Sequence, residues 1–348
     1  MRKNVLICLF TILFLWLIVV SIATFSANNN STNSQTITEY KVSGFSTDFS
    51  EVIEACKSSI VAVEQMGNVS SGFIYKSEND IVYIVTSFHG VSESNDVSLT
   101  FNSGAKANGK VLGYDIFTDI AIIECDFPYV VNVSKIGDST LLKDGEFILS
   151  IGTNGSLDYA FTSKFAMVSS RYIEVLNHIT FNEKDYEYYL GVEQLSGDIT
   201  KGYSGAPVLN MNGEVVGMIT MEDEDKVLSL TSDELKTVAD RIIDSSDYTR
   251  INFGFRGKYI CDLENYEVNS LNINIELTSG YYVSDVLPLS FAANVGILKN
   301  DVILKINDIE INDYDSMLNL IYSEASKYTF DILRDNESIR LIGTISNA

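Results

Sequence analysis

The sequence predicts a mainly β protein in which two six-stranded barrels are followed by a smaller C-terminal domain and preceded by an apolar segment. Three observations lead to this prediction. Short apolar stretches bounded by Gly, Asn, Ser and Asp recur between residues 60 and 220, as in all-β domains. A helical pattern at residues 231–243 separates them from a further set of apolar stretches. The run at residues 5–25 contains no charge.

The uncharged run of 21 residues is long enough to span a bilayer, and Arg2 and Lys3 before it favour a cytoplasmic N-terminus. We therefore expect a transmembrane anchor in residues 1–28 and a single-pass protein of the cell membrane whose body is extracytoplasmic. A cleaved signal peptide is the alternative, since small residues at 21–23 offer a cleavage site, and the body is then secreted. Residues 29–48, rich in Ser, Asn and Thr, are expected to form a flexible stalk.

The first barrel is predicted to begin after a short helix at residues 49–56. Six candidate strands follow, each short and each bounded by turn-forming residues. They are residues 60–65, 72–76, 81–87, 97–101, 110–115 and 120–124.

The second barrel is predicted from another six stretches that follow Pro128 and a turn at residues 137–139. Asn212-Gly213 has the chemistry of a tight hairpin turn and joins the last two of them. The six are residues 147–151, 159–169, 172–179, 186–195, 207–209 and 215–220.

The composition excludes some partners. The chain has 348 residues and a formal net charge of −23, and a surface this acidic repels nucleic acids and anionic lipid headgroups. Beyond the N-terminal segment the cysteines are Cys56, Cys125 and Cys261, an odd number without metal-type spacing. Neither a disulfide framework nor a metal site is therefore indicated.

Catalytic chemistry is suggested by Ser204, which lies between Gly202 and Gly205 in a predicted turn. A serine nucleophile needs a base and a site that stabilises the oxyanion, and this turn can direct the N–H groups of Gly202 and Ser204 to one point. The chain has two histidines, and His89 ends an apolar strand pattern. Asp119 is a carboxylate at the start of an apolar run. Singly, each of these residues has a purely structural explanation.

The three residues lie in motifs that together resemble the HtrA (Deg) family, whose members join a chymotrypsin-like protease domain to a PDZ domain. Residues 86–91 resemble the family's histidine motif, 118–123 its aspartate motif and 194–207 its serine motif, including Gln194 ten residues before the serine. The order His, Asp, Ser is that of chymotrypsin-type hydrolases. There are departures: Lys201 and Tyr203 replace the usual proline and asparagine, and Ala206 replaces the second glycine.

The resemblance implies a protease domain at residues 49–230, a helical connector at 231–250 and a PDZ domain at 251–348. It implies an ATP-independent, membrane-tethered serine endopeptidase that cleaves misfolded or unfolded extracytoplasmic proteins and needs no cofactor. In this reading Ser204 is the nucleophile, His89 the base and Asp119 its orienting carboxylate. Related proteases are commonly homotrimers. The alternative, kept open by the departures near Ser204, is a peptide-binding chaperone or scaffold that does not cut.

The PDZ assignment rests on Asn252-Phe253-Gly254-Phe255, which resembles the carboxylate-binding loop of PDZ domains, and on matching stretches at 281–307. The resemblance implies that peptide C-termini bind by strand addition beside this loop, with a helix at residues 315–324 as the other wall. A PDZ-shaped spacer without a ligand is the alternative.

The specificity pocket is predicted to be formed by Ile199 together with Met218, Ile219 and Thr220 on the opposite wall. Asp198 is expected to face solvent, because loop carboxylates are seldom buried. The pocket is therefore expected to accept small or medium aliphatic residues. His178 has no accompanying motif and is interpreted as a surface residue of a strand or loop.

Overall fold

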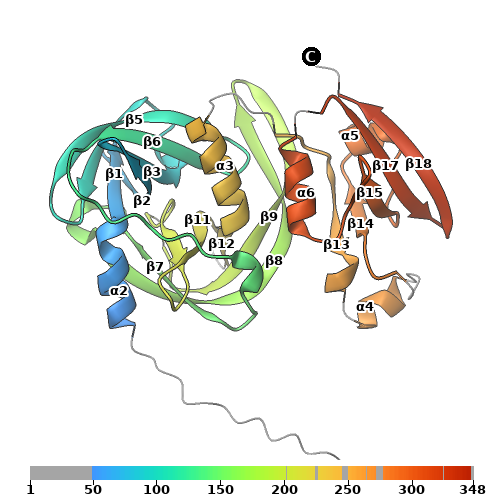
Figure 1. Ribbon diagram of the computed structural model, residues 1–348, viewed down its shortest axis with the longest axis horizontal. Coiled ribbons are helices and arrows are strands. Elements are labelled where there is room, and N and C mark those ends of the chain that lie inside the picture. Colours follow the sequence, from blue (N-terminus) through green and yellow to red (C-terminus); the bar gives the residue numbers. More distant parts are fainter. Residues whose placement is uncertain are drawn as a thin grey trace, which may run out of the picture. The chain divides into compact units, whose positions relative to one another are not determined.

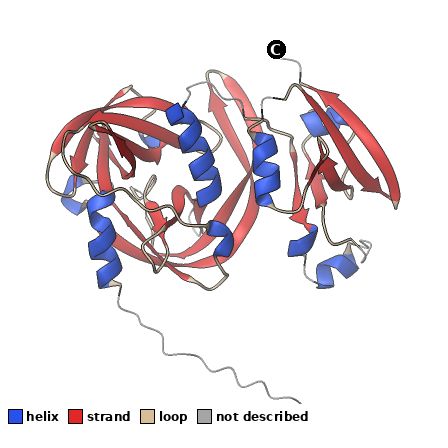
Figure 2. Ribbon diagram, in the orientation of Figure 1, coloured by secondary structure: helices blue, strands red, loops and turns tan. Residues whose placement is uncertain are grey.

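The computed structural model describes residues 49–200, 202–223, 226–244, 250–263, 265–271, 277–323 and 325–345. The predicted anchor and stalk lie outside these residues. Within the described ranges, no helix combines the length and apolar character needed to cross a membrane. Strands dominate the architecture, and the few helices connect or cover them (Figure 2).

The first barrel closes through six antiparallel strands in the order β1-β2-β3-β6-β5-β4, as predicted (Figure 1). Helix α2 (Ser50–Cys56) and a 3-10 turn (Lys57–Ser59) precede it, and the 3-10 turn η2 (Phe88–Gly90) follows β3. The strands are β1 (Ile60–Gln65), β2 (Asn68–Glu78), β3 (Ile81–Ser87), β4 (Asp96–Phe101), β5 (Lys106–Asp115) and β6 (Ile120–Asp126).

The second barrel also closes through six strands, in the order β10-β11-β12-β9-β8-β7. Two of its strands, β8 (Thr162–Phe181) and β9 (Lys184–Gly197), form a long hairpin. Its strands are β7 (Phe147–Gly152), β8 (Thr162–Phe181), β9 (Lys184–Gly197), β10 (Pro207–Leu209), β11 (Val215–Asp223) and β12 (Lys226–Thr231), with 3-10 turns at Ser139–Leu141 and Leu157–Tyr159.

The strand count of the second barrel is therefore right, but its membership differs from the prediction. Residues 162–169 of the first stretch and the whole stretch 172–179 belong to one strand, β8, because register shifts on either side of Ser170 let the pairing with β9 continue. The sixth strand is β12, which the prediction lacked. It pairs with both β9 and β11 and closes the barrel, directly before helix α3 (Ser232–Asp244).

The C-terminal part is a PDZ-like six-stranded sheet, ordered β13-β14-β15-β17-β18 with β16 beside β15, so that β13 lies at an edge. Helix α6 (Tyr314–Ile321) is shorter than the predicted helix at 315–324. The strands are β13 (Phe255–Tyr259), β14 (Tyr281–Val286), β15 (Val302–Ile306), β16 (Ile309–Glu310), β17 (Lys327–Arg334) and β18 (Glu337–Thr344). The helices are α4 (Asn265–Ser270), α5 (Phe291–Val295) and α6 (Tyr314–Ile321), with a 3-10 turn at Ile260–Asp262.

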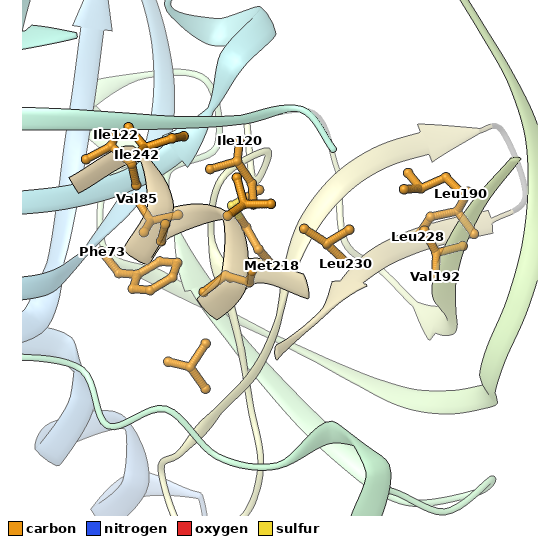
Figure 3. Close-up of a cluster of buried hydrophobic side chains, with 14 of the residues drawn as sticks. Phe73, Val85, Ile120, Ile122, Leu190, Val192, Met218, Leu228, Leu230 and Ile242 are labelled. Atoms are coloured by element: carbon orange, nitrogen blue, oxygen red, sulfur yellow. The ribbon is translucent and has the colours of Figure 1, made fainter. Parts of the chain in front are cut away.

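One apolar cluster joins the two barrels and α3, as Figure 3 shows. Phe73 and Ile120 come from the first barrel, Met218 and Leu230 from the second and Ile242 from α3, and all five are almost completely buried. Burying such side chains stabilises the fold by about 1.5–3 kcal/mol each. The shared core therefore fixes the barrels against each other, and with them the residues at their junction. Cys56, Cys125 and Cys261 form no disulfide within the described chain.

Candidate active site

His89 and Asp119 form a two-point contact between the first barrel's η2 turn and the turn before β6. The Asp119 carboxylate accepts from the His89 backbone N–H at 2.9 Å, and its other oxygen lies 2.7 Å from His89 Nδ1. Asp119 adopts a left-handed conformation with φ of 60°, and its carbonyl accepts from the Phe88 N–H. The contact fixes the plane of the imidazole and places Nε2 on the side away from the carboxylate.

The serine turn is docked onto the first barrel through β2. Gly205 has φ of 81°, and a Cβ there would lie 2.2 Å from the Ser71 carbonyl oxygen, so only glycine permits this approach. The Ser71 N–H donates to the Ser204 carbonyl at 3.1 Å. The Ser71 hydroxyl donates to the Gly202 carbonyl at 2.7 Å, and the Thr153 hydroxyl donates to the same oxygen at 3.0 Å.

These contacts fix the Gly202–Tyr203 peptide with its carbonyl directed toward the barrels. Gly202 has φ of 97°, and a Cβ would lie 2.1 Å from the Gly155 nitrogen. The Ser204 N–H has no acceptor among the described residues. The orientation of the Gly202 N–H depends on the peptide that it shares with Lys201, and Lys201 lies outside the described residues.

Two of the departures from the family's serine motif, Tyr203 and Ala206, have structural roles. Tyr203 is completely buried, and its hydroxyl donates to the Thr162 carbonyl at 3.0 Å, which ties the serine turn to the start of β8. Ala206 is also completely buried, next to Gly152 of β7. Both residues therefore support the turn from behind.

A single pocket of ≈ 470 Å³ contains all three predicted triad residues and Gly202. The β8–β9 hairpin contributes much of its wall, including His178. His178 is an exposed strand residue, as expected from the sequence, but the sequence did not indicate its place beside the catalytic candidates. The lining residues are His89, Ile116, Phe117, Asp119, Asn177, His178, Ile179, Tyr188, Leu190, Gly202, Ser204 and Thr220.

The structure places one of the four residues predicted for the specificity pocket beside Ser204. Thr220 lines the pocket with Ser204, but Ile199, Met218 and Ile219 do not. All three side chains are buried. Met218 and Ile219 alternate to opposite faces of β11, so Met218 packs into the core shared by the barrels and Ile219 into that of the second barrel, where Ile199 of the loop after β9 is also buried. Asp198 was expected to face solvent, and this is confirmed: its side chain is 86% exposed and lies 2.9 Å from Lys164 Nζ.

Comparison with known families agrees with this geometry. A family model described as a trypsin-like peptidase domain matches residues 70–218, which include His89, Asp119 and Ser204. A second model, described as a PDZ domain, matches residues 264–341. The chain belongs to the HtrA family of serine proteases. Its fold is that of a trypsin-like domain followed by a PDZ domain.

Individual relatives are similar to this HtrA-family chain over most of its length. "Serine protease Do-like HtrA" of Bacillus subtilis (strain 168) is 28% identical over 73% of this chain, and "Periplasmic serine endoprotease DegP" of Escherichia coli (strain K12) is 26% identical over 78%. The chain spans 58% and 56% of the lengths of those two proteins. The solved structure "HtrA-type protease AlgW with tripeptide" has a TM-score of 0.61 and 20% identity, and the match covers 85% of this chain and 96% of that one, which shows the common fold.

The predicted PDZ carboxylate loop leads into the edge strand β13. Gly254 has φ of 78°, and its carbonyl accepts from the Leu287 N–H, while the Phe253 carbonyl accepts from the Ala292 N–H. Phe253 and Phe255 are buried, and Asn252 donates from its side-chain amide to the Glu187 carbonyl of β9 at 3.0 Å. The loop therefore lies against the protease domain.

The groove beside this loop is nearly filled by protease side chains. Its remaining volume is ≈ 50 Å³, far below the roughly 300–1,000 Å³ typical of ligand sites. Tyr172 of β8 lies among the rings of Tyr259 and Tyr314, at centroid distances of 6.3 and 5.2 Å. Two residues along, Glu174 accepts from the Gly257 N–H of β13 at 2.8 Å.

Glu174 also accepts from the Tyr281 hydroxyl at 2.7 Å and from the Tyr172 hydroxyl at 3.1 Å. Burial raises the pKa of the Glu174 carboxyl, and these hydrogen bonds oppose the rise only in part. Sequence reasoning missed Tyr172 and Glu174. The only local signal was one acidic residue within the aromatic and aliphatic run at 172–176.

Proposed function

We propose that the chain is an ATP-independent serine endopeptidase that cleaves misfolded or unfolded extracytoplasmic proteins. The observation that supports it most is the two-point contact of Asp119 with His89 in the pocket that also contains Ser204. A base oriented by a carboxylate beside a serine is the arrangement that activates a hydroxyl nucleophile.

In the proposed reaction, Ser204 Oγ attacks the scissile carbonyl while His89 Nε2 takes its proton. Asp119 holds the imidazole in the tautomer that accepts this proton and stabilises the imidazolium that forms. The tetrahedral oxyanion is stabilised by the N–H groups of Ser204 and Gly202. His89 then delivers the proton to the leaving amine, and water repeats the sequence on the acyl-enzyme. No cofactor takes part.

Labelling with a fluorophosphonate, which phosphonylates activated serines, tests this proposal on the full chain. We expect wild type and His178→Ala to be labelled, and Ser204→Ala and His89→Ala to remain unlabelled while keeping their circular dichroism spectrum. Absence of labelling in wild type, with and without added unfolded casein, would instead support the non-catalytic chaperone or scaffold.

For specificity, we infer a preference for aliphatic residues N-terminal to the cut. The pocket wall carries Ile116, Ile179 and Leu190, and Asp198 is exposed and paired with Lys164, so it offers no buried partner for a basic side chain. A peptide library varied at this one position measures the preference. A preference for Arg or Lys that disappears in Asp198→Ala would contradict it.

For the C-terminal domain, we infer binding of peptide C-termini by strand addition at β13. The edge position of β13 and the loop at residues 252–255 support this inference, and solved AlgW structures contain a tripeptide or a decapeptide. The binding requires Tyr172 and Glu174 to leave the groove. Fluorescence anisotropy of a labelled peptide with a free C-terminus, and of its amidated counterpart, measures it.

For the location, we infer a single-pass membrane protein with an extracytoplasmic body, from the uncharged run at residues 5–25 and the preceding Arg2 and Lys3. Cell fractionation tests this inference. Recovery of most of the protein from the medium, with a new N-terminus near residue 24, would favour a cleaved signal peptide. A homotrimer is inferred from the family, and sedimentation of the detergent-solubilised chain measures its mass.

A further inference from the structure

Arg250, in the segment that joins α3 to the PDZ domain, lies in a buried cluster behind the active-site pocket. Its side chain is 6% exposed. Arg250 Nη2 donates to Glu234 of α3 at 3.2 Å, and its Nε donates to the Tyr322 hydroxyl at 3.3 Å. Burial opposes the charge, but Tyr322, Glu234 and Asp115 together raise the pKa of the guanidinium. Arg250 is therefore a fixed cation.

The guanidinium also lies over two aromatic rings that form the wall of the catalytic pocket. Arg250 Cζ is 5.5 Å from the centroid of Phe117 and 6.0 Å from that of Tyr188. Both rings line the pocket with Ser204 and pack edge to face on each other at 5.0 Å. A cation over an aromatic ring is attracted by the negative face of the ring, and more strongly when it is buried. Arg250 thus supports this wall from behind.

Phe117 belongs to the turn that carries Asp119. Asp115 begins the turn, and its carboxylate accepts from the N–H groups of Phe117 at 2.7 Å and Thr118 at 3.3 Å. Arg250 therefore interacts with the turn in two ways. Its guanidinium lies over the Phe117 ring, and its charge interacts with that of the Asp115 carboxylate. Two residues after Phe117 the turn places the carboxylate that orients His89.

We propose that Arg250 is a positioning residue for the reaction. Through Phe117 and Asp115 it holds the turn that carries Asp119 in the position from which Asp119 orients His89. The inference rests on the proposed serine-protease function. Tyr322 and Tyr314 of the C-terminal domain complete the same cluster by donating to Glu234, so the position of Arg250 also depends on that domain.

A simpler role, neutralising buried Glu234, makes a different prediction. Lysine keeps the positive charge but lacks the planar guanidinium that stacks on the rings. If Arg250 only pairs with Glu234, Arg250→Lys retains activity. If it positions the Asp119 turn, Arg250→Lys loses activity, whereas Glu234→Gln, which leaves the stacking intact, stays near wild type.

The test is the second-order rate of fluorophosphonate labelling of the full chain between pH 5 and 9. For Arg250→Lys and for Arg250→Ala/Glu234→Gln, which avoids an unpaired buried carboxylate, we expect rates at least about tenfold lower at pH 7, equivalent to about 1.4 kcal/mol. The acidic limb of the profile should move to lower pH, because a displaced Asp119 stabilises the imidazolium less. If Arg250 only stabilises the fold, the acidic limb of the variants should stay at the wild-type pH.

Arg256 provides the matched control, because its guanidinium also lies over an aromatic ring, at 5.2 Å from that of Tyr189. Tyr189 is on the same strand as Tyr188, but it does not line the catalytic pocket. Arg256→Ala should be labelled within about twofold of wild type. Folding is checked by circular dichroism and thermal unfolding. Labelling of folded Arg250→Lys at the wild-type rate, with an unchanged profile, would overturn the inference. Absence of labelling in wild type would overturn the proposed function itself.

Discussion

The catalytic pocket and the PDZ groove differ sharply in how open they are. The pocket has a volume of ≈ 470 Å³, and the His89 side chain is 55% exposed. The groove retains ≈ 50 Å³, because Tyr172 and Glu174 of the protease domain occupy it. The structure therefore combines an accessible candidate active site with a PDZ groove that the chain's own side chains occupy.

The same two strands form a wall of both sites. On β9, Tyr188 and Leu190 line the catalytic pocket, whereas the alternate residues Tyr189 and Gly191 line the groove. Gly191 leaves room for Tyr172, since a Cβ there would lie 2.6 Å from its ring. The β8–β9 hairpin thus separates the two sites by a single layer of backbone.

The largest effect is expected at the open site. Asp119→Asn should lower turnover of a peptide substrate by about 10⁴-fold, because the amide favours the wrong imidazole tautomer. Steady-state kinetics measures it, with Asp198→Asn, an exposed carboxylate that follows β9 of the second barrel, as the control at wild-type level. A loss of less than about tenfold would remove Asp119 from the triad.

The closed site should open when its occupants are removed. In a Ser204→Ala background, which prevents cleavage, Tyr172→Ala/Glu174→Ala should bind a fluorescein-labelled peptide with an apolar, free C-terminus about tenfold more tightly than the parent. The control is Leu176→Ala/Asp185→Ala, two exposed positions on the same hairpin. Equal affinities of all three proteins would mean that the groove is not blocked in solution.

Glu193 is a buried glutamate of β9 in the second barrel, and it does not line the PDZ groove. It is completely buried, and burial raises the pKa of its carboxyl well above the usual range. Because the folded state holds this proton more tightly, stability falls as pH rises above the unfolded pKa. Glu193→Gln should therefore raise the unfolding free energy by about 1–2 kcal/mol at pH 8 and by less at pH 5.

Urea unfolding at the two pH values measures this difference. Glu187→Gln, an exposed neighbour on β9, should leave both values unchanged. A gain for Glu193→Gln that is equal at both pH values would show that Glu193 does not titrate differently in the folded state.

The smallest effect concerns the pH dependence of the groove. Burial raises the pKa of Glu174 in the closed arrangement, so closure is most stable below the ordinary carboxyl range and weakens as pH rises through the raised pKa. Peptide affinity should therefore increase a few-fold from pH 5 to pH 8. Anisotropy titrations of Glu174→Gln should lose this increase. A steeper dependence in the variant would contradict the role of Glu174.

Local patterns in the sequence were sufficient for the barrels and for the triad candidates. Alternating apolar stretches and turn residues predicted two six-stranded barrels, and three motifs identified His89, Asp119 and Ser204, which the structure places in one pocket. The glycines at 202 and 205 were identifiable because their left-handed backbone excludes side chains. These features depend on neighbours a few residues away, and such neighbours are visible in a sequence.

Tertiary structure decided the rest. Whether 159–179 forms one strand or two depended on pairing with β7 and β9, and β12 became visible only as the strand that closes the barrel. An apolar side chain fits an aliphatic pocket as well as a core, so the sequence did not distinguish the two environments for Ile199, Met218 and Ile219. Only the tertiary packing shows that they lie in the cores. Tyr172, Glu174 and Arg250 act on partners more than 60 residues away. Contacts over such separations leave no periodic pattern in the sequence, because they form only where two surfaces come together in the folded protein.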